Sequence, residues 1–121
     1  MGRKNHNPSI ARRILQDLKK GESPEQLIPI AKSITDPYYV SLSLTYIASS
    51  NSLKSSKSEK LFKTVFSQAN NVEQSWRRLE LLGEICKKMK NIRDVDLKEM
   101  QYRQILKLML SEKGKNTKEF F

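Results

Sequence analysis

An 18-residue stretch of this chain is echoed 38 residues further on. Residues 31–48, AKSITDPYYVSLSLTYIA, align without gaps with residues 69–86, ANNVEQSWRRLELLGEIC. A repeated segment is expected to adopt the same structure in both copies, and offsets of this size are typical of repeats built from pairs of helices. The matched pairs are Ala31 with Ala69, Ile34 with Val72, Tyr38 with Trp76, Leu44 with Leu82, Ile47 with Ile85 and Ala48 with Cys86.

The two copies give different local signals. Apart from the adjacent Tyr46 and Ile47, residues 39–47 alternate bulky with small or polar side chains, as a half-buried strand does, although Asp36-Pro37 in front of them is a helix-opening pair. The second copy is plainly helical, because its apolar residues recur at steps of three and four with charged residues between them. If the copies share a fold, 37–50 is also a helix, capped by Asp36, and its aromatic and β-branched content predicts burial on more than one side.

Further helix starts are marked along the chain. Each start is a residue that can cap a first turn, in most cases followed by a proline or by a Glu or Gln of a capping box. They are Asn7-Pro8, Ser23-Pro24-Glu25-Gln26, Ser56-Lys57-Ser58-Glu59, Asn71-Val72-Glu73-Gln74 and Asp96-Leu97-Lys98-Glu99. In the first helix we expect a buried stripe of Ile10, Ile14 (or Leu15) and Leu18, and in the last helix a stripe of Leu97, Met100, Leu106 (or Ile105) and Met109.

A shorter apolar segment precedes each copy, PEQLIPIAKS before the first and EKLFKTVFSQA before the second. Each unit is therefore predicted to be a helical hairpin. We expect one all-α domain of about six helices over residues 1–121. Its predicted parts are a flexible basic arm at 1–7, a helix at 8–20, hairpins at 24–50 and 56–90, a helix at 95–112 and a polar tail at 113–121.

The hairpin pattern resembles the HEAT-type repeats of the α-solenoids over residues 24–90. Pro29 lies inside the first helix of a hairpin, and Asp36 and Val40 stand where that family has an Asp followed by Val-Arg. The sequence departs from the pattern at Ser41, which replaces the arginine, and in the second copy, which has Asn71 for the Asp and lacks the proline. The resemblance implies a short solenoid that serves as a scaffold or binding surface and not as a catalyst.

Composition bounds the function further. Charged residues make up 30% of the chain and apolar residues 37%, and no apolar run is long enough for a membrane span or an export signal. We therefore expect a cytoplasmic protein with no membrane partner. The formal net charge of +10 is spread along the chain and favours polyanionic partners.

No catalytic or metal-binding motif is evident. The single cysteine, Cys86, and the single histidine, His6, are too few for a His/Cys metal site, and Cys86 is expected to be buried. Glu80 and Glu84 share a helical face with basic residues, which is typical of salt bridges and not of paired catalytic carboxylates. The sequence therefore predicts no cofactor, no metal and no enzymatic activity.

Three basic groups are the candidate polyanion-binding residues. They are Arg12, Arg13, Lys19 and Lys20 on the first helix, Lys57, Lys60 and Lys63 at three-residue spacing, and Arg77, Arg78, Lys87 and Lys88 on the second copy. Whether these three groups form one continuous basic face depends on how the hairpins stack. The aromatic residues Tyr38, Tyr39, Tyr46 and Trp76 are assigned to the core, and no nucleic-acid-binding signature is evident.

The leading hypothesis is a non-enzymatic interaction module that binds a protein partner. The alternative is sequence-independent binding of RNA or DNA through the basic residues. A short solenoid leaves end faces uncovered, so self-association through them is also expected.

Overall fold

The structure is a computed structural model and describes residues 7–92 and 94–120. Within these residues the chain forms six α-helices and one short 3-10 helix, with no strand. The predicted all-α class and the number of helices are therefore confirmed. The elements are α1 (Asn7–Lys19), α2 (Pro24–Lys32), α3 (Pro37–Ala48), α4 (Ser55–Asn70), α5 (Ser75–Lys88), η2 (Met89–Asn91) and α6 (Val95–Phe120).

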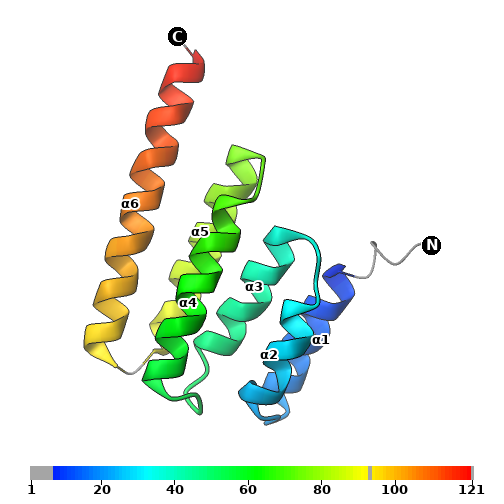
Figure 1. The fold of residues 1–121 in the computed structure, drawn as a ribbon. Helices are drawn as coiled ribbons and strands as arrows, with labels where there is room; N and C mark the ends of the chain where they lie inside the picture. The colour runs from blue at the N-terminus through cyan, green and yellow to red at the C-terminus, as the bar shows by residue number, and fades with distance from the viewer. Residues whose placement is uncertain (1–6, 93, 121) are drawn as a thin grey trace, which may run out of the picture.

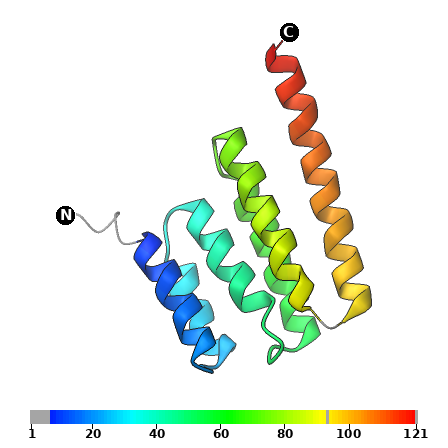
Figure 2. The same ribbon diagram turned by 180° about the vertical axis from the view of Figure 1, so that it is seen from behind.

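Helix α3 lies at the centre of the molecule. It contacts α1, α2, α4 and α5. Figure 1 shows α2 and α4 in front of α1 and α5, and in the reverse view of Figure 2 α1 and α5 are in front. Helix α6 lies beyond the second hairpin and contacts α4 and α5. The helices thus form two layers with α3 enclosed between them and α6 at one end.

The two hairpins keep the 38-residue offset of the sequence. Helix α2 ends at Lys32 and α4 at Asn70, while α3 begins at Pro37 and α5 at Ser75. Each connection, 33–36 or 71–74, contributes one apolar side chain to the core, and these two residues, Ile34 and Val72, are 5% and 4% exposed. The ambiguous stretch 39–47 is helical, as its second copy predicted.

Helix α3 is enclosed by other helices, which explains why it contains small hydroxyl residues at buried positions. Ser41, Ser43 and Thr45 are completely buried between the neighbouring helices, where small side chains allow close approach. The Ser41 hydroxyl donates to the carbonyl of Val65 on α4 at 3.0 Å, and the Thr45 hydroxyl donates to the carbonyl of Ser41 at 2.7 Å. These bonds satisfy buried polar groups that would otherwise destabilise the fold.

The cap at Asp36 is confirmed. Its carboxylate accepts a hydrogen bond from the Tyr38 backbone N–H at 2.9 Å, with Pro37 in the first turn of α3. Ser23 is also the residue before α2, but its side chain makes no capping bond. Asn7 stands at the start of α1, and its amide donates to the Thr35 hydroxyl at 3.4 Å, so its position ties α1 to the α2–α3 connection.

Three predicted capping boxes are wrong in detail. Helix α4 begins at Ser55 with Lys54 as its N-cap, two residues before the predicted cap Ser56, and Ser58 lies within the helix and donates to the Ala48 carbonyl at 2.6 Å. Asn71 is the C-cap of α4, and Gln74 precedes α5 without a side-chain cap. Asp94 caps α6 in place of Asp96, because its carboxylate accepts from the Leu97 N–H at 3.0 Å, and this bond lowers the pKa of Asp94.

The helices at the two ends of the chain follow the prediction in part. Ile14 is buried, with Ile10 and Leu18 partly buried against the same core. In α6, Leu97 and Ile105 are buried, but Met100 and Leu106 are 52% and 58% exposed. Helix α6 also continues to Phe120, where a polar tail was expected from residue 113. The predicted arm at 1–7 lies outside the described residues, apart from Asn7.

Candidate interaction surface

Helices α5 and α6 pack against each other, and the side chains of Cys86 on α5 and Tyr102 on α6 are in contact at this interface. Tyr102 lies against Cys86, and burial together with this neighbour raises the pKa of the Tyr102 phenol. Cys86 is only partly buried, although it packs against the core. This contact fixes which side of each helix faces the other.

Exposed apolar residues border this contact on both helices. Leu106 and Leu110 follow Tyr102 by four and eight residues, and Val95 precedes it by seven, so all three lie on the same side of α6 as Tyr102. On α5, Trp76, Leu79 and Gly83 precede Cys86 at helical spacing. The exposed fractions are 63% for Trp76, 72% for Val95, 58% for Leu106 and 61% for Leu110. These six residues form what we call the α5–α6 face: Trp76, Leu79, Gly83, Val95, Leu106 and Leu110.

Gly83 leaves a shallow space in this face. A Cβ placed on Gly83 would meet no atom within 4 Å, and Leu79 beside it is half-buried. A glycine inside a helix costs stability, roughly 0.5–1 kcal/mol relative to alanine, and gives no packing in return here. Gly83 therefore adds no packing to the described fold and leaves open space in the α5–α6 face.

Sequence reasoning missed this surface by assigning Trp76 to the core. Its partner in the aligned repeat, Tyr38, is half-buried because α5 covers it: the Arg77 guanidinium lies 4.3 Å from the Tyr38 ring centroid. Among the described residues, no further helix covers Trp76 on α5 as α5 covers Tyr38 on α3. The exposure of Trp76 depends on whether another hairpin follows α4–α5. An alignment of the two copies does not contain this information.

Five of the predicted basic residues are engaged within the fold. Lys57 pairs with Glu25 at 2.8 Å, which lowers the pKa of Glu25. Arg78 donates to the carbonyls of Val72 and Glu73 and to the Ser75 hydroxyl, closing the α4–α5 connection. The other three pairs are Arg77 with Asp36 at 3.5 Å, Lys87 with Glu84 at 3.6 Å, and Lys88 with the Tyr46 ring at 5.1 Å.

The remaining six basic residues are exposed and have no ion-pair partner among the described residues. They are Arg12, Arg13, Lys19, Lys20, Lys60 and Lys63. Lys19 of the first group and Lys88 of the third line one groove of about 260 Å³ with Tyr46, where α1, α3 and α5 end. The second group lies on α4, in the opposite layer from α1 (Figures 1 and 2). The three groups therefore do not merge, but two of them meet at Lys19 and Lys88.

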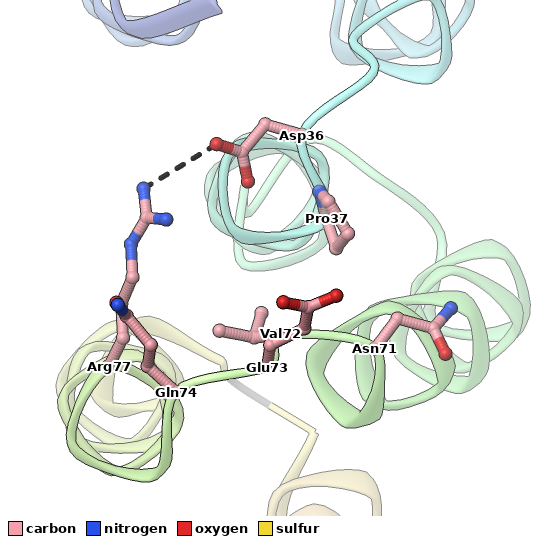
Figure 3. Close-up of a pocket in the computed structure, with 7 residues that line it drawn as sticks. All are labelled: Asp36, Pro37, Asn71, Val72, Glu73, Gln74 and Arg77. Carbon is pink, nitrogen blue, oxygen red and sulfur yellow. Dashed lines mark ion pairs between the residues drawn. The ribbon is translucent and has the colours of Figure 1, made fainter.

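A pocket of about 350 Å³ lies where the two hairpin connections come together. Figure 3 shows Arg77 reaching from α5 toward Asp36 at the start of α3. Asp36 is already engaged by the Tyr38 N–H and by Arg77, so it is committed to holding α3 and α5 together. Asn71, Glu73 and Gln74 form the rest of the polar rim. The arrangement contains no paired nucleophile and base.

Within the described residues, no three His, Cys, Asp or Glu side chains come close enough to hold a metal ion. None of the helices in that part of the chain combines the length and apolar character that crossing a membrane requires.

Comparison with known proteins identifies no relative. No protein-family model, no curated protein sequence and no solved structure gives a significant match to this chain.

Proposed function

We propose that this chain is a cytoplasmic, non-enzymatic, HEAT-like helical-repeat module whose α5–α6 face binds an amphipathic helix of a partner protein. The observation that carries the proposal is the row of exposed apolar side chains along the line where α5 and α6 meet. Large exposed apolar residues that gather on one surface are typical of interaction sites, whereas scattered ones are ordinary.

The internal geometry of the molecule supports a helix as the occupant. Helix α3 packs on α2 of its own hairpin, on α4 and α5 of the next, and on α1. Helix α5 takes the corresponding place beside α4 and α6. A helix lying on α5 and α6 would continue this pattern by one unit, and within the described residues the chain supplies none. The net charge of +10 favours a partner helix with acidic residues on its outer face.

The test uses Trp76, the only tryptophan of the chain, as a reporter. The probe is an 18-residue amphipathic peptide with leucines at helical spacing and glutamates on the other face. Binding buries the exposed indole, so its fluorescence emission shifts to the blue on titration. A peptide of the same composition in scrambled order keeps the charge but loses the apolar stripe, and should give no shift.

Two matched variants locate the site. Leu106→Glu places a charge within the α5–α6 face and should weaken binding at least tenfold. Ile30→Glu is the control, because Ile30 is 45% exposed on α2, a helix that packs on α1 and α3 and not on α5 or α6. Equal loss in both variants, or no shift with up to about 1 mM peptide, contradicts the proposal. Light scattering could instead show a dimer that Leu106→Glu converts to a monomer. This result would contradict a different partner protein and identify a second copy of this chain as the occupant of the face.

A second candidate function is sequence-independent binding of RNA or DNA, favoured by the meeting of Lys19 and Lys88 in one groove. Binding to phosphates releases counterions, so affinity for a labelled single-stranded RNA or duplex DNA should fall steeply between 50 and 200 mM salt. Lys19→Ala combined with Lys88→Ala should weaken this binding more than Lys60→Ala combined with Lys63→Ala does. No binding at the lower salt removes this candidate.

A further inference from the structure

A second groove lies on the other side of α6, between α6 and α4. Its volume is about 350 Å³. Met100 and Gln104 border it and lie one turn apart on α6, away from the stripe of Tyr102 and Leu106 that faces α5. The groove is therefore separate from the α5–α6 face. The lining residues are Glu59, Lys63, Phe66, Ser67, Asn70, Met100, Gln101 and Gln104.

The polar side chains of this groove have no partners within the described structure. Gln101 is only 6% exposed, yet its carboxamide makes no hydrogen bond to any described residue. The same is true of Asn70 and Gln104, which reach the groove from opposite helices. The Gln101 amide atoms are not among the buried side-chain atoms that lack a partner, and the residue lines the groove. A carboxamide in this position has a donor and an acceptor available to a ligand in the groove.

We infer that the α4–α6 groove binds an extended peptide segment through its backbone. A carboxamide carries a donor and an acceptor side by side, and a peptide group presents the complementary pair. Three carboxamides along one groove, at Asn70, Gln101 and Gln104, can therefore hold successive peptide groups of a chain that passes between the helices.

The dimensions and the remaining side chains suit such a segment. Glu59 and Asn70 are eleven residues apart on α4, so the lining spans about 16 Å at 1.5 Å per residue. An extended chain rises about 3.3 Å per residue, so about five residues fill this length. Met100, 52% exposed, offers an adaptable apolar contact, and Lys63 offers a charge for an acidic side chain.

A nucleobase is the other planar ligand that carboxamides recognise, and the groove suits it less well. Bases bind proteins largely by stacking on exposed aromatic rings. The one aromatic residue of the groove, Phe66, is 6% exposed and its ring stacks on Phe62 at 6.1 Å, so no ring face is open. Lys63 alone also makes a poor phosphate site.

The inference goes beyond the proposed helix-binding function and is tested independently of it. The probe is a capped hexapeptide of alternating leucine and aspartate, added to ¹⁵N-labelled full-length protein. The side-chain amide NMR signals of Asn70, Gln101 and Gln104 should shift, while that of Gln16, which is exposed on α1, should not. The same peptide with N-methylated backbone amides cannot donate hydrogen bonds and should bind at least tenfold more weakly.

Two variants separate binding from folding. Gln101→Leu removes the groove-lining carboxamide and should weaken peptide binding at least tenfold with no loss of thermal stability, whereas Gln16→Leu should leave binding within twofold. Gln104→Ala changes an exposed position and provides the same test without disturbing the core. Absence of shifts at 5 mM peptide overturns the inference, as does binding that survives both groove variants. Larger shifts with adenosine or uridine monophosphate than with the peptide would overturn it in favour of a nucleobase.

Discussion

The hairpins α2–α3 and α4–α5 share one register but not one environment. Positions 38 residues apart agree in burial where they set the hairpin: Leu44 and Leu82 are 0% and 2% exposed, and Ile47 and Ile85 are both fully buried. Helix α3 has neighbours on four sides, whereas α5 ends the row and keeps an open side next to α6. The residues that the two copies share thus form the core of each hairpin, and the residues that differ reflect which helices lie next to it.

The residues between the shared positions show the difference. Ser41, Ser43 and Thr45 on α3 align with Leu79, Leu81 and Gly83 on α5. These small residues let other helices approach α3 closely, and the hydroxyls of Ser41 and Thr45 donate to backbone carbonyls. On α5, the buried position is filled by Leu81, and the open side carries Leu79 and Gly83. A sequence can therefore repeat its hairpin without repeating the surface of that hairpin.

The largest expected difference between the hairpins concerns their core leucines. Leu44→Ala should lower the free energy of unfolding by about 3–5 kcal/mol and Leu82→Ala by about 2–3 kcal/mol. Both side chains are buried, but α3 is held by four neighbours and cannot close the cavity, while α5 can move inward from its open side. Urea denaturation measures both values. A larger loss for Leu82→Ala would show that α5 is as constrained as α3.

A smaller difference concerns the caps that begin the second helices. Asp36 caps α3 and pairs with Arg77, whereas the equivalent Gln74 makes no side-chain cap. Asp36→Ala should cost about 1–2 kcal/mol, and Gln74→Ser should gain about 0.5–1 kcal/mol by supplying the missing acceptor. Thermal unfolding followed by circular dichroism detects both changes. If Gln74→Ser destabilises the protein, the α5 start already satisfies its backbone N–H groups by another route.

Much of the fold could be predicted from the sequence, because its signals are local. Pro37 and Asp36 fix the start of α3 whatever surrounds it, and the 38-residue alignment was enough to decide between strand and helix at 39–47. Met100 was misplaced, and the choice between Leu106 and Ile105 was left open, because α6 carries apolar residues around most of its circumference, so periodicity alone could not identify the side that faces α4 and α5.

The candidate surfaces could be predicted far less well, because they depend on which helices are neighbours. Lys19 and Lys88 meet only because α1 and α5 both pack on α3, and Trp76 is exposed only because α5 ends its row. Gln101 was not singled out at all, since a glutamine in a charged helix is expected to face solvent. Contacts between segments that are distant in the sequence decide where each of these side chains lies. Such contacts cannot be read from the local pattern of a single sequence.

The smallest expected effect is confined to α3 and tests why that helix contains serines. Ser41 and Ser43 are both fully buried, but the Ser41 hydroxyl donates to Val65 while that of Ser43 has no partner within the described residues. Replacement of either by alanine gains the same helix propensity, about 0.5 kcal/mol, so the hydrogen bond alone distinguishes them. Ser41→Ala should be neutral or destabilising by up to about 1 kcal/mol, because it removes a satisfied bond, and Ser43→Ala should stabilise by about 1 kcal/mol, because it removes an unpaired buried hydroxyl. Equal changes in the urea midpoint would mean that Ser43 gains a partner in solution, such as a buried water, and that the hydroxyls of α3 act alike.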